Sequence, residues 1–480
     1  MADRIGTQVR NPMTHNNSTN AVMFPEGFGW GTATASYQIE GAVDADGRTK
    51  SIWDTFSHEP GRIKDGTNGD RACDHYNRWD EDVSLIAELG APFYRFSLAW
   101  PRLQPGGTGP LNQAGIDFYA RLADSLREKG VTPWVTLYHW DLPQELEDAG
   151  GWPNRDTAYR LADFGAAVYE VLGDHIDIWT TLNEPLCSSL LSYADGEHAP
   201  GRQEPASAVR AAHHLLLGHG LTMQRWNKVR KPGHEFGITI NLSPVIPMSD
   251  TPEDLDAARR VDGVTNRLFL DPVLKGEYPA DVIEDLKPLM DFSHVKDGDL
   301  EIIHQPMDAL GINYYQRNPV RTGGPDALDR FRPGVMAVGT GDVEQCSQGL
   351  PLTGRGWEID PEGMVEVLRM VCEGYDAPPL WVTENGSSWV DEPGTDGVFH
   401  DEERVAYLDS HIRAARAALD AGVDLRGYFV WSLMDNFEWA YGESSRFGLI
   451  HVDYETQKRT PKDSFRWFQN VVTHNGIRGD

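Results

Sequence analysis

The chain contains the stretch Trp381-Val382-Thr383-Glu384-Asn385-Gly386, an apolar and β-branched run that ends in an acid, an amide and a glycine. Runs of this kind favour a buried strand. A carboxylate placed where a buried strand meets a loop loses hydration, and burial disfavours its charge. Taken alone, Glu384 is as compatible with a paired structural acid as with a catalytic one.

A second stretch repeats this pattern. Ile178-Trp179-Thr180-Thr181-Leu182-Asn183-Glu184-Pro185 is also apolar and β-branched, and it also places a glutamate beside an asparagine. Two strands that each carry one carboxylate at the carboxyl end provide the pair of groups that acid/base chemistry requires. The repetition therefore favours catalytic roles for Glu184 and Glu384.

Outward from these two stretches, strands alternate with helices along the chain. Strands are predicted at Phe28–Ala35, Phe93–Trp100, Pro133–Tyr138, Ile178–Glu184, Phe236–Asn241, Ala309–Tyr315, Leu380–Glu384 and Gly427–Leu433. Helices are predicted near 80–89, 112–130, 157–172, 206–230, 255–269, 361–374 and 402–421. Alternation of this kind implies parallel strands joined by helical crossovers.

Two architectures fit such a pattern, a doubly wound open sheet and a closed barrel. The open sheet usually carries a glycine-rich phosphate turn after an early strand, and Phe28–Ala35 lacks the GxGxxG pattern. Eight units, with polar residues after many of the strands, favour a single (β/α)8 barrel, the TIM barrel, with long βα loops that form the active-site rim.

The expected domain organisation is simple. Residues 1–20, rich in Asn, Thr and Ser, are expected to be a disordered leader, and residues 21–480 a single catalytic barrel domain. The stretch 316–356 is long, rich in Gly and Pro and has no clear period. It follows the sixth predicted strand, so we expect a lid or a pocket wall on the loop face of the barrel.

Composition limits the function classes. The chain has 43 basic and 73 acidic residues and a net charge of −30, which argues against nucleic acid and anionic membranes as partners. Its four cysteines lie far apart without a CxxC motif, so neither a disulfide framework nor a zinc site is indicated. The polar N-terminus lacks a signal peptide core and no apolar run is long enough to span a membrane, so a cytoplasmic location is expected.

In a barrel, the carboxyl ends of all strands converge on one rim. The residues expected there are amides, carboxylates, an imidazole and aromatic groups, a mixture that suits sugar hydroxyls and the apolar face of a sugar ring. They are Gln38, Arg95, His139, Asn183, Glu184, Asn313, Tyr315, Glu384, Trp431 and Glu438. We expect no phosphate site, because no cluster of Arg or Lys is evident at these strand ends, and no metal site, because His213, His214 and His219 lack a carboxylate to complete a ligand set.

Several motifs together resemble family 1 glycoside hydrolases, the β-glucosidase group. The motifs are Phe28–Gly41, Tyr94–Ser97, Tyr138–Asp141, Thr181–Pro185, Val382–Gly386, Phe437–Trp439 and Gly448–Tyr454. The resemblance as a whole runs from about Phe24 to Phe468. The resemblance implies a TIM barrel that needs no cofactor. It also implies hydrolysis of terminal β-D-glucosyl residues from small β-glucosides, cellobiose and short oligosaccharides, with retention of configuration.

The same resemblance assigns roles to individual residues. Glu384 would be the nucleophile and Glu184 the acid/base, while Arg95 and Tyr315 would orient Glu384 and keep it ionised. Asn183 would hold the sugar 2-hydroxyl, Trp357 would flank the aglycone entrance, and the sugar subsite would be lined by Gln38, His139, Trp431, Glu438 and Trp439. Many members carry Trp two residues after the acid/base where this chain has Leu186, so aglycone stacking at that point is not expected.

Four other functions are alternatives to this assignment. An inactive sugar-binding barrel has no use for both Glu184 and Glu384. A 6-phospho-β-glycosidase is disfavoured because Glu438 would face the phosphate, and because Ser445 and Phe447 stand near the places where that branch carries Lys and Tyr. A member that prefers fucosides or galactosides, and transglycosylation alongside hydrolysis, both stay open.

Overall fold

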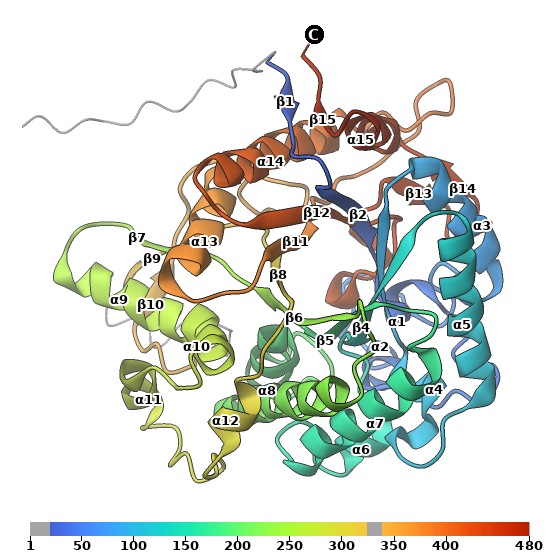
Figure 1. Ribbon diagram of the computed structural model, residues 1–480. Helices are drawn as coiled ribbons and strands as arrows, with labels where there is room; N and C mark the ends of the chain where they lie inside the picture. The colour runs from blue at the N-terminus through green and yellow to red at the C-terminus, as the bar shows by residue number, and fades with distance from the viewer. Residues whose placement is uncertain (1–19, 324–337, 480) are drawn as a thin grey trace, which may run out of the picture.

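Eight parallel strands close into a barrel in the order β11-β12-β2-β3-β4-β5-β6-β8, as the predicted fold requires (Figure 1). The structure is a computed structural model that describes residues 20–323 and 338–479. The leader expected at 1–20 therefore lies outside the described residues except for Asn20. The barrel strands are β2 (Gly29–Ala33), β3 (Phe93–Ser97), β4 (Thr132–Tyr138), β5 (Ile178–Asn183), β6 (Glu235–Asn241), β8 (Ala309–Asn313), β11 (Leu380–Asn385) and β12 (Leu425–Trp431).

Large and small side chains alternate inside the barrel so that the rings can fill it. A cluster of buried side chains that includes Trp134, Trp381 and Phe429 draws on several strands, which places it in the barrel interior. A Cβ atom on Gly29 would lie 2.3 Å from the ring of Trp381, and one on Gly427 would lie 2.2 Å from the same ring. Glycine at these two positions therefore makes room for the Trp381 indole.

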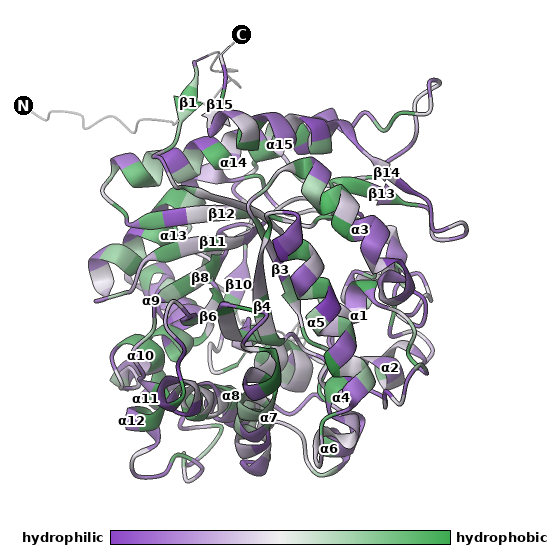
Figure 2. Ribbon diagram, turned by 45° about the vertical axis from the view of Figure 1, so that its right-hand side comes forward, coloured by the Kyte–Doolittle hydropathy of each residue, from purple (hydrophilic) through white to green (hydrophobic). Residues whose placement is uncertain are grey.

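Helices surround the barrel and cover the outer face of its strands (Figure 1). Along the outer helices, hydrophobic and hydrophilic residues alternate in bands, as expected for helices with one buried face (Figure 2). The longest are α3 (His75–Leu89), α5 (Gln113–Glu128), α7 (Asp156–Leu172), α8 (Pro205–Lys228), α13 (Pro361–Gly374), α14 (Glu402–Asp420) and α15 (Asp463–His474). Shorter ones are α1 (Ser36–Ile39), α2 (Ile52–Ser57), α4 (Trp100–Leu103), α6 (Gln144–Asp148), α9 (Pro252–Asp262), α10 (Leu268–Leu274), α11 (Ala280–Leu286) and α12 (Asp299–Ile303).

The predicted helices are confirmed in position, with one difference in continuity. Asn112 caps α5 as its sequence suggests, because its side chain accepts a hydrogen bond from the amide of Ala114. The helix expected over 255–269 is instead α9 and α10 joined by a π-helical segment, Gly263–Arg267. The apolar pattern continues through this segment, so periodicity alone did not reveal the change of helix type.

Five predicted strands extend too far at their carboxyl ends. Ala35 lies beyond β2, Trp100 begins α4, Glu184 follows β5, Tyr315 lies beyond β8, and Leu433 lies beyond β12. Most of the side chains there are apolar or aromatic and stay buried, although the barrel ladder has already ended. Hydrophobicity therefore marked burial at these positions, not strand pairing.

Of the stretch 316–356, residues 324–337 lie outside the described residues, and the rest contributes to a small sheet and to the pocket wall. Its strands β9 (Asn318–Thr322) and β10 (Val343–Gln345) pair with each other and, through β9, with β7 (Val245–Pro247). Gln316 and Arg355 line the cavity described below, which confirms the expected pocket wall. The remaining strands form two-stranded sheets: β1 (Val22–Met23) with β15 (Gly476–Ile477), and β13 (Ile450–Val452) with β14 (Arg459–Pro461).

Within the described parts of the chain, no helix combines the length and the apolar character that crossing a membrane requires.

Candidate active site

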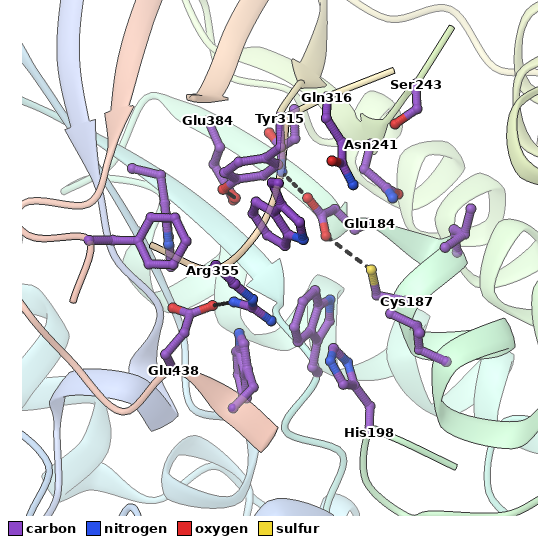
Figure 3. Close-up of a pocket in the computed structure, with 18 of the residues that line it drawn as sticks. Glu184, Cys187, His198, Asn241, Ser243, Tyr315, Gln316, Arg355, Glu384 and Glu438 are labelled. Carbon is purple, nitrogen blue, oxygen red and sulfur yellow. Dashed lines mark hydrogen bonds and ion pairs between the residues drawn. The ribbon is translucent and has the colours of Figure 1, made fainter. Parts of the chain in front are cut away.

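A cavity of about 290 Å³ opens at the carboxyl ends of the barrel strands (Figure 3). Most of the residues predicted from the sequence line it: His139, Glu184, Asn313, Tyr315, Trp357, Glu384, Trp431, Glu438 and Trp439. The other three, Gln38, Arg95 and Asn183, are buried behind this lining, and each hydrogen-bonds a residue that belongs to it. The structure thus brings together every site residue that the sequence predicted.

Glu384 lies near the end of β11 and is held by two donors. Arg95 donates from Nη1 to Oε1 of Glu384 at 2.7 Å, and Tyr315 donates from its hydroxyl to Oε2 at 2.9 Å. Burial raises the pKa of Glu384, and the charge and hydrogen bonds of Arg95 and Tyr315 act in the opposite direction. Both oxygens of Glu384 therefore have fixed positions, and Arg95 favours the ionised form.

The two residues after Glu384 fix the end of its strand. Asn385 donates to the carbonyl of Tyr314 at 2.7 Å and accepts from the hydroxyl of Tyr428 at 2.6 Å. A Cβ atom on Gly386 would lie 1.7 Å from the carbonyl oxygen of Trp431. In the Glu-Asn-Gly sequence, Glu384 is therefore the catalytic candidate and Asn385 anchors the end of the strand. Gly386 is required because the main chain of Trp431 leaves no room for a side chain.

Glu184 follows β5 and has different partners. Asn313 donates from Nδ2 to Oε1 of Glu184 at 2.7 Å, and the thiol of Cys187 donates to Oε2 at 3.1 Å. Burial, and then the nearby charge of Glu384, raise the pKa of Glu184 to about 8. Glu184 is therefore protonated at neutral pH, as a general acid must be.

Arg95 connects the two strands that carry the acids. Its Nη1 donates to Glu384, and its Nη2 donates to Oδ1 of Asn183 at 2.6 Å. Nδ2 of Asn183 lies 3.0 Å from Nε2 of His139. Burial, together with the charge of Arg95, holds the pKa of His139 well below its usual value, so this ring is neutral.

The main chain is unusual at three residues of the cavity. Glu184, Trp140 and Trp439 have φ angles of 48°, 76° and 50°, a left-handed conformation that residues other than glycine rarely adopt. The amide of Glu184 is held in place by a 3.0 Å hydrogen bond to the carbonyl of Thr239 in β6. Strained positions of this kind cluster at functional sites, where packing keeps a side chain aimed at one point.

Glu438 forms a second polar group in the cavity. Its Oε2 accepts from Nε2 of Gln38 at 3.3 Å, and its Oε1 accepts from Nη1 of Arg355 at 2.9 Å. Figure 3 shows Arg355 and Glu438 facing each other across their ion pair. The indole rings of Trp431, Trp439 and Trp357 complete this lining with the flat apolar surfaces that sugar rings favour.

The sequence did not identify several residues of the cavity. Those not predicted include Trp140, Cys187, Glu197, His198, Asn241, Gln316, Arg355 and Tyr441. Cys187 had a usable signal, because three residues after Glu184 is one helical turn away. Arg355 had none, since it comes from the stretch 316–356 without strand or helix periodicity.

Each of the histidines His213, His214 and His219 of α8 has a hydrogen-bonding partner within the fold. His213 lies within 2.9 Å of Asp299, His214 within 2.9 Å of the carbonyl of Trp152, and His219 within 2.7 Å of the hydroxyl of Thr181.

The amino-acid sequence is similar to those of known glycosidases. Residues 20–477 match the family model described as "Glycosyl hydrolase family 1". The chain is 48% identical to a bifunctional β-D-glucosidase/β-D-fucosidase of Bifidobacterium breve, over 95% of this chain and 100% of that protein. It is 46% identical to β-glucosidase A of Thermotoga maritima, over 95% of this chain and 99% of that protein.

Solved structures give the same result. A family 1 β-glucosidase from Thermotoga maritima superposes with a TM-score of 0.90 at 45% identity, covering 95% of this chain and 99% of that one. A psychrophilic β-glucosidase from Micrococcus antarcticus also has a TM-score of 0.90, at 47% identity, covering 95% of this chain and 98% of that one. With its closed barrel, its paired glutamates and a match to the family model over nearly its whole length, the chain belongs to glycosyl hydrolase family 1.

Proposed function

We propose that Glu384 and Glu184 carry out the retaining β-glucosidase reaction of this chain, with Glu384 as nucleophile and Glu184 as general acid and base. The observation that carries this assignment is the difference between their environments. Arg95 and Tyr315 donate to Glu384, whereas burial and the charge of Glu384 raise the pKa of Glu184 to about 8. In this proposal Glu384 is the ionised carboxylate at neutral pH, favoured by the charge of Arg95, and Glu184 holds the proton.

In the first step, the ionised carboxylate of Glu384 attacks the anomeric carbon of the β-glucoside. Glu184 gives its proton to the glycosidic oxygen as the bond to the aglycone breaks, so the alcohol leaves uncharged. The sugar is then an ester of Glu384 with inverted configuration. When this ester is broken again, Arg95 and Tyr315 donate hydrogen bonds to the carboxylate of Glu384 as it leaves.

In the second step, Glu184 is ionised and acts as a base. It removes a proton from water, the water oxygen attacks the anomeric carbon, and the carboxylate of Glu384 leaves. Glu184 ends protonated, as it began, and the two inversions release β-glucose. An alcohol or a second sugar that takes the place of water would give transglycosylation by the same route.

The remaining cavity residues bind the sugar in this proposal. Asn183 shares the donor Arg95 with Glu384 and the donor Asn313 with Glu184, which supports its role at the 2-hydroxyl. Gln38, His139, Asn313, Trp431, Glu438 and Trp439 would hold the other hydroxyls and the ring, and Trp357 would flank the aglycone. Small β-glucosides, cellobiose and short oligosaccharides are the expected substrates, and no metal or cofactor takes part in any step.

A second substrate class has specific support. The relative from Bifidobacterium breve, which is 48% identical over its whole length, is described as both a β-glucosidase and a β-fucosidase. We therefore expect fucosides to be hydrolysed as well. Phosphorylated substrates stay disfavoured, because Glu438 would face the phosphate and the neighbouring cation, Arg355, is already paired with that carboxylate.

For the protein as a whole, we propose a single catalytic barrel domain over 21–480 that works in the cytoplasm without a nucleic acid or membrane partner. The acidic net charge of −30 supports the second part, and the four free cysteines fit a reducing compartment.

The stereochemistry of the product tests this proposal. Hydrolysis of 4-nitrophenyl β-glucoside, followed by proton NMR in the first minutes, should show β-glucose before any α-glucose. Initial release of the α-anomer would show an inverting reaction, and absence of turnover would remove the assignment altogether.

A further inference from the structure

Arg355 is the cation of the cavity to which no role has been given. It lies in the loop beyond β10, its side chain is 9% exposed, and it lines the cavity together with Glu438. The guanidinium carbon stands 3.6 Å from the ring centre of Tyr441 and 4.5 Å from that of Trp357. Two aromatic rings and the ion pair with Glu438 therefore hold the guanidinium in one place.

Arg355 and Glu438 offer opposite hydrogen-bonding functions side by side. An ionised carboxylate only accepts hydrogen bonds, and a guanidinium only donates them, with five N–H groups in a fixed fork. The bond to Glu438 uses one of these five. A sugar hydroxyl both donates and accepts, so a carboxylate next to a guanidinium can satisfy both halves of one hydroxyl or of two neighbouring hydroxyls.

The orientation of the pair is also fixed from the other side. Gln38 donates to Oε2 of Glu438 at 3.3 Å and to Oδ1 of Asn436 at 3.0 Å, which holds the plane of the carboxylate. Burial raises the pKa of Glu438, and the charge of Arg355 acts in the opposite direction. Arg355 thus has a minimal role as the counter-ion of Glu438, and the question is whether it also contacts the sugar.

We propose that Arg355 is a specificity-determining residue that donates a hydrogen bond to a sugar hydroxyl next to Glu438. Because the 2-hydroxyl is assigned to Asn183, which Arg95 and Asn313 tie to the two glutamates, this hydroxyl is the one at C4 or C6. The substrates it favours are neutral β-glycosides that carry both of these hydroxyls. This inference rests on the proposed function, in which Glu438 belongs to the sugar subsite.

The test compares Arg355→Met with the wild-type enzyme on deoxy sugars. Methionine keeps an unbranched side chain against Tyr441 and Trp357 but has no N–H group. Initial rates give kcat/KM for the nitrophenyl β-glucoside and its 2-deoxy, 4-deoxy and 6-deoxy analogues. We expect Arg355→Met to lose about tenfold or more on the glucoside and on the 2-deoxy analogue, but less than about threefold on the 4-deoxy or the 6-deoxy analogue.

A second pair of variants separates direct contact from an effect through Glu438. In Glu438→Gln the neighbouring group is neutral and needs no counter-ion. If Arg355 donates to the sugar, adding Arg355→Met to Glu438→Gln should still lower kcat/KM more on the glucoside than on the 4-deoxy or the 6-deoxy analogue. If Arg355 acts only through the charge of Glu438, adding Arg355→Met has no selective effect, and the proposal is overturned.

Equal losses on all four substrates would overturn the proposal as well. Circular dichroism and thermal unfolding show whether Arg355→Met folds. If it does not, the second variant is Arg355→Gln, whose shorter side chain keeps an N–H donor. It should show a smaller selective loss at the same carbon. A wild-type enzyme without activity on any β-glucoside would instead refute the proposed function, so the two failures are distinguishable.

Discussion

The thiol of Cys187 lies 3.1 Å from Oε2 of Glu184 and donates a hydrogen bond to it. The other oxygen, Oε1, accepts from Asn313, whose amide nitrogen can only donate. When Glu184 is protonated, its proton therefore sits on Oε2, where the sulfur can turn from donor to acceptor. Cys187 thus accommodates both protonation states of Glu184 that the reaction requires.

This contact predicts a change in pH dependence. The hydrogen bond from Cys187 favours ionised Glu184 and lowers its pKa, against the larger effects of burial and Glu384, which raise it to about 8. In the proposed mechanism the first step needs protonated Glu184, so activity should fall as the pH rises through this pKa. In Cys187→Ala the pKa should rise, so the basic limb of the kcat/KM profile should move to higher pH.

Cys187→Ser is the matched control, because a hydroxyl also donates and accepts. Its basic limb should stay close to that of the wild type. A purely structural role for Cys187 would lower activity at all pH values and leave the limb in Cys187→Ala unmoved. An unchanged limb, or one displaced to lower pH, would contradict the prediction.

Azide should distinguish the two glutamates. In Glu184→Ala the nucleophile remains, so an activated glucoside can still glycosylate Glu384, but the base for the second step is missing. Activity on the unactivated substrate should fall by about 10²–10⁴-fold. Azide needs no base, and it should restore turnover and give the β-glucosyl azide.

In Glu384→Ala no glycosyl-enzyme can form, so azide must attack the substrate from the opposite face. The product should be the α-glucosyl azide, which NMR distinguishes from the β-anomer. The reverse pattern, with the α-azide from Glu184→Ala, would mean that the two roles are exchanged. Wild-type enzyme, with both groups present, should show no gain from azide.

Glu438→Ser should be far more damaging than a surface change. Hydrogen bonds to a charged group contribute about 1.5–3 kcal/mol each, so the loss of two from the sugar predicts a fall in kcat/KM of roughly 100-fold or more on β-glucosides. The change also leaves the buried Arg355 without its partner. The exposed Glu455→Ser is a control that should behave like the wild type, and a similar result for Glu438→Ser would exclude Glu438 from the sugar subsite.

The stability of the fold should depend on Lys462, a buried cation outside the cavity. Lys462 is fully buried and donates to Asp435 at 2.7 Å and to Asp391. Lys462→Met leaves these buried acids with one cation fewer, although Arg446 and Arg404 still contact them, so we expect a loss of roughly 3 kcal/mol and a lower Tm in calorimetry.

The control for Lys462 is Lys287→Met. Lys287 is 58% exposed and pairs with Glu284 on the surface, where an ion pair contributes little. Its Tm should equal that of the wild type within error. Equal effects of the two changes would mean that the buried network around Lys462 does not stabilise the fold.

Much of the fold was predictable because its determinants are local. Apolar, β-branched runs between amphipathic stretches marked all eight barrel strands, and Asn112 marked the start of α5. The ends were less accurate, as at Trp100 and Tyr315, because burial under the rim loops continues past the last ladder hydrogen bond. The small sheet of β7, β9 and β10 was not predicted because its strands are short, and because β9 and β10 lie in the stretch 316–356, which has no clear period.

The site was predictable for a related reason. Parallel strands in a barrel bring their carboxyl ends to one rim, so a polar residue at the end of a strand is placed by topology alone. Glu184, Glu384, Asn313 and His139 could therefore be assigned to one cavity from the sequence. The pairing of Arg95 with Glu384 was expected only from the family resemblance, since the two residues are 289 positions apart and meet only when the barrel closes.

The sequence by itself thus determined the barrel, the two carboxylates and the rim on which they meet. Only the tertiary structure shows that the two carboxylates differ in their surroundings, because burial and donors such as Arg95 come from other strands. It also decided that Arg355 faces Glu438 and that Cys187 contacts Glu184. Such contacts arise from the packing of loops and helices on the rim, for which a single sequence has no periodic signal.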